Sequence, residues 1–189
     1  SSVAKARIGE FAARNMTPGD VIFVGTGSTT AQFIQYLNPD QNLTVITSSL
    51  PHASFLASRG VRVISTGGLV ATEDLAQSGS IAAWSISRYN ANLAVIGAQG
   101  ISQKSGLSEV NFEIAELNRV MVEHADKTWV LADLSKAGAQ SPYHAVDLEE
   151  VTTIVTTHDG VDLFEFEVEG ACEVLSAPLS SFTFANDPK

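Results

Sequence analysis

Short apolar runs that alternate with helix-like segments constrain the fold of this chain most strongly. Each run is four or five residues long, which suits a strand and is far too short to span a membrane. Strands that alternate with helices indicate an α/β fold with an open, mostly parallel sheet covered by helices on both faces. The expected strands lie at residues 21–24, 43–47, 61–65, 93–97, 129–132 and 153–156.

The segments between these runs predict helices at residues 3–16, 29–37, 50–58, 81–89 and 110–125. The last is the clearest, because Ile114, Leu117 and Met121 recur at helical spacing. Apolar residues alternate with glutamates over residues 164–169, which predicts an edge strand. Residues 170–176 suit one further strand.

No linker or change in composition divides the chain, so we expect one domain over residues 1–189, with a frayed end at 186–189. The sequence begins at Ser1 rather than Met, which suggests a piece of a longer protein. It opens with no signal-peptide pattern, and we expect no membrane partner. Cys172 is the only cysteine, which excludes a disulfide within the chain and fits a reducing cytoplasm.

The charge balance argues against nucleic acid as a direct partner. Eleven Lys and Arg against twenty-one Asp and Glu give a net charge of −10, which repels a phosphate backbone. The four histidines lack the spacing of metal ligands, and no cofactor motif is present, so neither a metal nor another cofactor is expected. These histidines are His52, His124, His144 and His158.

A glycine- and hydroxyl-rich loop follows the first expected strand and precedes the next helix. Glycine permits close backbone approach, and the first N–H groups of a helix lack partners and face bound anions. The loop therefore predicts a phosphate site, although a hydroxyl-capped helix start without a ligand would show the same residues. It matches neither the nucleotide-binding P-loop nor Gly-x-Gly-x-x-Gly. The loop comprises Gly25, Thr26, Gly27, Ser28, Thr29 and Thr30.

Small or polar residues also follow four more strands, at residues 47–49, 66–68, 99–100 and 133–136. Because ligands of open α/β sheets bind outside the carboxyl ends of the strands, these segments are expected to converge on one site. Each alone is equally typical of an ordinary loop.

Three charged residues are candidates for this site. Lys136 is placed to neutralise a phosphate or reach a sugar carbonyl, or else it is a solvated loop lysine. Asp133 is placed to orient Lys136 or to accept sugar hydroxyls. Glu113 is suited to the same role, although an acid in the first turn of a helix also complements the helix dipole.

Six segments of the chain carry a resemblance to a known family: residues 23–30, 43–50, 67–69, 96–101, 118–123 and 130–136. In order and spacing they resemble the effector-binding domain of DeoR-family transcriptional regulators. That family joins an N-terminal winged helix-turn-helix to a sugar-phosphate sensor with the ribose-5-phosphate isomerase type of α/β fold. The resemblance covers about residues 5–158 and implies that only the sensor is present here, with DNA contacted through the missing N-terminal domain. It also implies a homo-oligomer, a dimer or tetramer, because repressors read paired half-sites.

Matched by position, the resemblance implies that the 25–30 loop holds the phosphate. It implies that the rest of the pocket is lined by Ser48, Gly67, Gly68, Gly100, Glu113 and Lys136. Four places depart from the family pattern and bear on which effector is bound. The family's usual Thr-Asp after the sixth strand appears here as Thr-Thr-His at 156–158. Gly25 stands where the family usually has Asp, Ser48 where it often has Asn, and Asn118 where it often has Lys.

Two other functions remain to be weighed. A sugar-phosphate isomerase or deaminase of the same fold needs a general base, and ribose-5-phosphate isomerases carry Asp-Gly-Ala-Asp-Glu and Lys-Gly-Gly-Gly-Gly for this work. The chain has Gly-Ala-Gln-Gly at 97–100 and Lys-Ser-Gly-Leu at 104–107 instead, so we expect no enzyme. An assembly module without a ligand is compatible with the acidic composition and the apolar run at 161–166.

Overall fold

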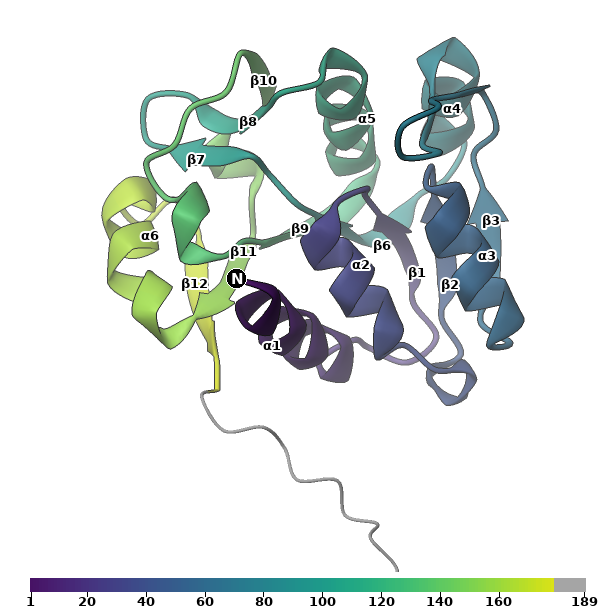
Figure 1. The fold of residues 1–189 in the computed structure, drawn as a ribbon, viewed down its shortest axis with the longest axis horizontal. Helices are drawn as coiled ribbons and strands as arrows, with labels where there is room; N and C mark the ends of the chain where they lie inside the picture. Colours follow the sequence, from purple (N-terminus) through teal and green to yellow (C-terminus); the bar gives the residue numbers. More distant parts are fainter. Residues whose placement is uncertain (179–189) are drawn as a thin grey trace, which may run out of the picture.

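A seven-stranded sheet forms the centre of the molecule (Figure 1), in the computed structural model that describes residues 1–178. Its order is β12-β11-β9-β6-β1-β2-β3, and every neighbouring pair is parallel. All six predicted strands are present, which confirms the α/β prediction. The strands are β1 (Val21–Val24), β2 (Thr44–Thr47), β3 (Arg62–Ser65), β6 (Ala91–Ile96), β9 (Ala125–Leu131), β11 (Thr153–Thr157) and β12 (Glu173–Ala177).

Helices cover both faces of the sheet, as predicted. One face packs against α1 (Ser2–Arg14), α2 (Ser28–Gln35) and α3 (Leu50–Ser58). The other packs against α4 (Gly79–Ser87), α5 (Phe112–Glu123) and α6 (Val161–Val168). The five helices predicted before residue 126 begin and end within two residues of their expected bounds.

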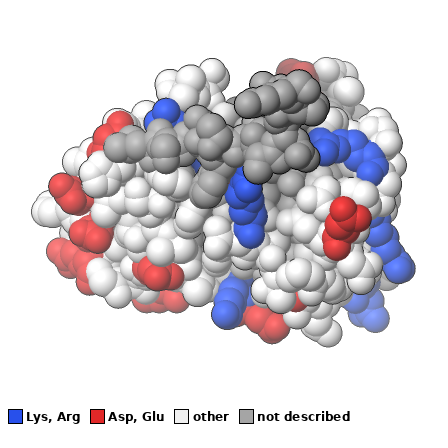
Figure 2. All heavy atoms as spheres, turned by 90° about the horizontal axis from the view of Figure 1, so that it is seen from below, with Lys and Arg blue, Asp and Glu red and all other residues white. Residues whose placement is uncertain are grey.

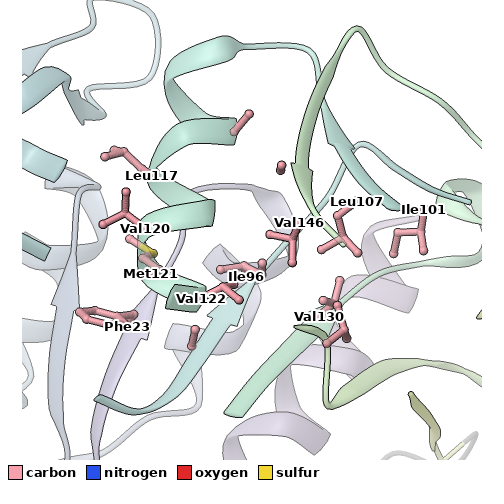
Figure 3. Close-up of a cluster of buried hydrophobic side chains, with 14 of the residues drawn as sticks. Phe23, Ile96, Ile101, Leu107, Leu117, Val120, Met121, Val122, Val130 and Val146 are labelled. Atoms are coloured by element: carbon pink, nitrogen blue, oxygen red, sulfur yellow. The ribbon is translucent and has the colours of Figure 1, made fainter. Parts of the chain in front are cut away.

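The core beneath α5 illustrates why this helix was clear in the sequence. Figure 3 shows Met121 on the side of α5 that lies toward Phe23 and Ile96 of the sheet, and Leu117 and Val130 belong to the same buried cluster. All five side chains are buried. Residues at helical spacing thus bury one stripe of α5 against continuous apolar strands, which fixes the helix over the carboxyl half of the sheet.

Two small antiparallel sheets complete the fold, and the sequence analysis did not predict them. One consists of β10 (Tyr143–Val146), β8 (Gly106–Glu109) and β7 (Gly100–Ser102); the other pairs β4 (Leu69–Val70) with β5 (Gln77–Ser78). Short 3-10 helices connect several elements. They are η1 (Pro39–Gln41), η2 (Leu134–Lys136), η3 (Leu148–Glu150) and η4 (His158–Gly160).

The prediction of an edge strand at 164–169 is wrong, because most of this segment lies in α6. Phe164 and Val168, one helical turn apart, are both buried, whereas Phe166 is 75% exposed. The period-two pattern came from this exposed Phe166, which a helix tolerates on its outer side. The strand expected at 170–176 is confirmed as β12, and the expected frayed end at 186–189 lies outside the described residues.

Charge is unevenly distributed over the surface. Figure 2 shows acidic side chains gathered at the end of the molecule where α6 lies, with Lys and Arg side chains toward the middle and the opposite end. Within residues 1–178, no helix has the length and apolar character needed to cross a bilayer.

Candidate functional site

The predicted loop leads from β1 into α2 and lines a cavity of about 190 Å³. Gly27 caps α2 with a φ of 133°, a conformation that only glycine adopts without strain. The Thr30 hydroxyl donates to the Gly27 carbonyl over 3.0 Å, which closes the first turn. The unpartnered N–H groups of this turn and the positive end of the α2 dipole therefore face the cavity. Thr26, Gly27, Ser28, Thr29 and Thr30 all line it.

Lys136 lines the same cavity from η2, which follows β9. Its ammonium donates to Gln99 Oε1 over 2.8 Å, and Gln99 also lines the cavity. The loop N–H groups and a lysine charge thus converge on one small space, which suits an anion.

Asp133 is buried and acts on the turn that carries Lys136 rather than lining the cavity. Its Oδ1 accepts hydrogen bonds from the Ser135 amide, over 3.0 Å, and from the Ser135 hydroxyl. Burial works to raise the pKa of Asp133, but these hydrogen bonds and nearby positive charges, Lys5 among them, outweigh it and lower the pKa. An ionised Asp133 therefore holds η2 in place.

A second cavity, of about 210 Å³, adjoins the first and shares Thr26, Asp74 and Ile114 with it. Of the predicted site residues, Gly25, Ser48 and Glu113 line this second cavity. Together the two spaces reach the size of typical small-molecule sites, about 300–1,000 Å³. The rest of the lining mixes polar and apolar side chains, namely Leu69, Ala71, Ala76, Gln77, Ser78, Asn111, Leu117, Asn118 and Met121.

Three predicted glycines are not among the described residues that line these cavities: Gly67, Gly68 and Gly100. A Cβ at Gly68 would lie 2.4 Å from the Ser78 carbonyl oxygen, and one at Gly100 would lie 2.2 Å from the Ala139 carbonyl oxygen. These two glycines allow backbone segments to pass each other closely. Close packing of the backbone therefore accounts for glycine at these two positions.

Three charged residues that the sequence analysis did not select lie at the site, and one of them, Asp74, lines both cavities. Glu109 ends β8, is only 5% exposed and lines the 190 Å³ cavity with Lys136. Lys5 on α1 donates to Ser28 Oγ over 2.9 Å. No sequence signal identified Glu109 or Lys5, because β8 was not predicted and Lys5 reaches the loop from a helix twenty-three residues earlier.

No group of three or more His, Cys, Asp or Glu side chains placed to hold a metal ion was found within residues 1–178. The linings of the two cavities offer hydrogen-bond donors, the ammonium of Lys136 and the carboxylates of Asp74, Glu109 and Glu113.

Comparison with known proteins gives a consistent family match. Residues 1–158 match the family model described as the DeoR C terminal sensor domain. The chain is 34% identical over 155 residues to an HTH-type transcriptional regulator, YulB, of Bacillus subtilis, covering 82% of this chain and 60% of the relative. It is 30% identical over 128 residues to the L-fucose operon activator of Haemophilus influenzae, covering 67% and 51%. The chain thus spans about half to three fifths of the length of these relatives.

The fold is also found among solved structures. A ribose 5-phosphate isomerase A from Methanocaldococcus jannaschii aligns with a TM-score of 0.52 and 20% identity, covering 70% of this chain and 52% of that enzyme. At this identity the likeness concerns the fold alone, and it confirms the predicted ribose-5-phosphate isomerase-like architecture.

Proposed function

The chain belongs to the family of DeoR C-terminal sensor domains, and on this premise we propose that it binds a phosphorylated sugar to control DNA binding by a separate N-terminal domain. One observation carries the proposal: the start of α2 and Lys136 line the same cavity. Helix N-termini and lysines both commonly hold phosphate in proteins. The adjoining cavity, with Ser48, Asn111 and Glu113, supplies hydrogen-bond partners for sugar hydroxyls.

DNA is proposed to be a partner only through that separate domain. The relatives are named as transcriptional regulators, or as an operon activator, and are longer than this chain. The chain itself carries a net charge of −10, with an acidic end over α6 (Figure 2). We therefore expect the isolated chain to leave promoter DNA unshifted even at low salt. The intact regulator is proposed to act in the cytoplasm as a dimer or tetramer that matches paired half-sites.

A sensing role is favoured over catalysis by what lines the cavity after β6. That segment contributes Gly97, Ala98 and Gln99, none of which is a general base. A sugar-phosphate isomerase or deaminase remains the alternative, because carboxylates from other elements reach the two cavities.

Thermal denaturation with a panel of sugar phosphates tests the proposal. Ribose 5-phosphate, fructose 6-phosphate, glucose 6-phosphate and glucosamine 6-phosphate form the panel, with the unphosphorylated sugars as controls. A compound present at a hundred times its dissociation constant stabilises the fold by about 2.7 kcal/mol. We expect at least one sugar phosphate, and no free sugar, to stabilise the chain without being converted. No stabilisation by any compound would favour an assembly module, and turnover would favour the enzyme.

A further inference from the structure

Glu109 is a buried carboxyl group inside the proposed phosphate cavity. It is 5% exposed, yet it lines the same 190 Å³ space as Ser28 and Lys136. A cavity of this size leaves little distance between a phosphate held at the start of α2 and the carboxyl of Glu109. The carboxyl of Glu109 is thus placed to contact a carbon chain attached to that phosphate.

Asn118 connects Glu109 to the adjoining cavity. Its Nδ2 donates to Glu109 Oε1 over 3.4 Å, a long hydrogen bond between two buried side chains. Asn118 lines the 210 Å³ cavity, as does Gly25, where a Cβ would lie 3.2 Å from Asn118 Oδ1. The pair Glu109 and Asn118 thus stands where the two cavities meet, and Gly25 leaves room beside it.

We propose that Glu109, held by Asn118, binds the sugar hydroxyls next to the phosphate and selects which phosphorylated sugar the domain accepts. This inference rests on the proposed function. A buried carboxyl group that contacts hydroxyls discriminates well, because a ligand without them leaves the carboxyl unpaired. The long bond to Asn118 leaves capacity on the carboxyl oxygens for such contacts.

Binding of a phosphate dianion here is linked to a proton on Glu109. Burial raises the pKa of Glu109 to about 7, although the charge of Lys136 partly offsets this. The other titratable group that lines the same cavity is Asp74, and Glu113 lines the adjoining one; both are acidic and disfavour a second negative charge. A bound dianion raises the pKa of Glu109 further, so the complex takes up a proton.

Isothermal titration of the full chain with the four panel sugar phosphates, and with inorganic phosphate, tests the selection step at pH 7.0. Glu109→Ala is expected to bind the preferred sugar phosphate about tenfold more weakly, while inorganic phosphate binds no more weakly than to wild type. Glu149→Ala, an exposed glutamate in η3, is the matched control and should behave as wild type. Equal weakening for both compounds, or no weakening, overturns the proposal.

The number of protons taken up on binding is measured with wild-type protein, by repeating the sugar-phosphate titration at pH 7.5 in two buffers with different ionisation enthalpies. Uptake of about half a proton or more is expected, and about tenfold weaker binding at pH 8.8 than at pH 7.0. Glu109→Gln, which stays neutral, should show neither effect. A pH profile unchanged by Glu109→Gln overturns the inference but not the proposed function, whereas absence of all sugar-phosphate binding overturns both.

Discussion

The ammonium of Lys5 donates a hydrogen bond to the Ser28 hydroxyl over 2.9 Å, and this contact joins α1 to the first residue of α2. The two helices also pack closely, since a Cβ at Gly9 of α1 would lie 2.6 Å from the Phe33 amide nitrogen of α2. The Lys5 side chain therefore connects α1 to an anion bound at the start of α2.

Removing the Lys5 ammonium is expected to weaken sugar-phosphate binding and to uncouple α1 from the loop. Lys5→Ala should raise the dissociation constant by roughly threefold to tenfold, because a half-exposed cation contributes less than a buried one. Amide hydrogen exchange provides the second readout: the sugar phosphate should protect residues 2–14 in wild type and not in the variant. Lys127→Ala, at the amino end of β9, is the control. Wild-type affinity and protection in Lys5→Ala would contradict this role.

Replacing Gly27 with Val is expected to abolish sugar-phosphate binding. The φ of 133° is the physical reason, since a branched residue must shift the backbone that presents the N–H groups; space is not limiting, as the nearest atom to a Cβ would be Thr30 Oγ1 at 3.7 Å. Gly19→Val is the matched control, because Gly19 also has positive φ, at 87°, with nothing near a Cβ. Both variants should lose about 1–3 kcal/mol of stability, but only Gly27→Val should lose binding. Equal affinities in titration calorimetry would place the phosphate elsewhere.

Lys136 is expected to bind the phosphate through charge and hydrogen bonding. Lys136→Ala should therefore weaken binding by about 1.5–3 kcal/mol, measured by calorimetry. Its present partner, Gln99 Oε1 at 2.8 Å, is neutral, so the ammonium keeps its capacity for an anion. Borohydride treatment with an open-chain sugar phosphate should trap no adduct. A trapped adduct would instead identify a Schiff base.

The sequence predicted the central sheet well because its inner strands, such as β1, β2, β6 and β11, are mostly buried and rich in apolar residues. It did not predict β4 and β5, which are two residues each, or β8, whose four residues are all buried among other elements. Such strands exist only through tertiary contacts. The alternation of apolar and acidic residues over 164–169 wrongly predicted a strand, because Phe166 is apolar but lies exposed on α6.

The candidate site was predicted where it depends on local chain geometry. The loop before α2, Glu113 in the first turn of α5 and Lys136 after β9 all line the two cavities. Glu109 and Lys5 reach the site through long-range packing, which no local pattern reveals. Gly100 also packs closely against the Ala139 carbonyl, a requirement for glycine that the sequence did not reveal.

Buried His52 should make stability depend on pH. Burial lowers the pKa of His52 from 6.5 to about 4, and its Nδ1 has no partner among the described residues. As the pH falls, the imidazole of His52 therefore takes up a proton in the unfolded chain before it does so in the folded one. The contribution of neutral His52 to the free energy of unfolding is complete above pH 6.5 and is lost as the pH falls toward 4. By pH 5.0 the loss is about 2 kcal/mol.

Urea unfolding at pH 7.5 and 5.0 measures this loss as a difference between wild type and His52→Gln. Both proteins share Glu109, whose raised pKa acts in the opposite direction, so the difference isolates His52. The difference in the free energy of unfolding between wild type and His52→Gln should shrink by about 2 kcal/mol at pH 5.0. The difference between wild type and His158→Gln, at an exposed histidine, should show no such change. A constant gap would contradict the prediction.

The most direct test of the central claim is an NMR titration of the ¹⁵N-labelled chain with the four panel sugar phosphates. The account predicts that one of them shifts the backbone amide resonances of Gly27, Ser28, Thr29 and Thr30 saturably, with the dissociation constant found by calorimetry. Saturable binding that leaves these four amides unmoved, or no binding by any of the compounds, would contradict it.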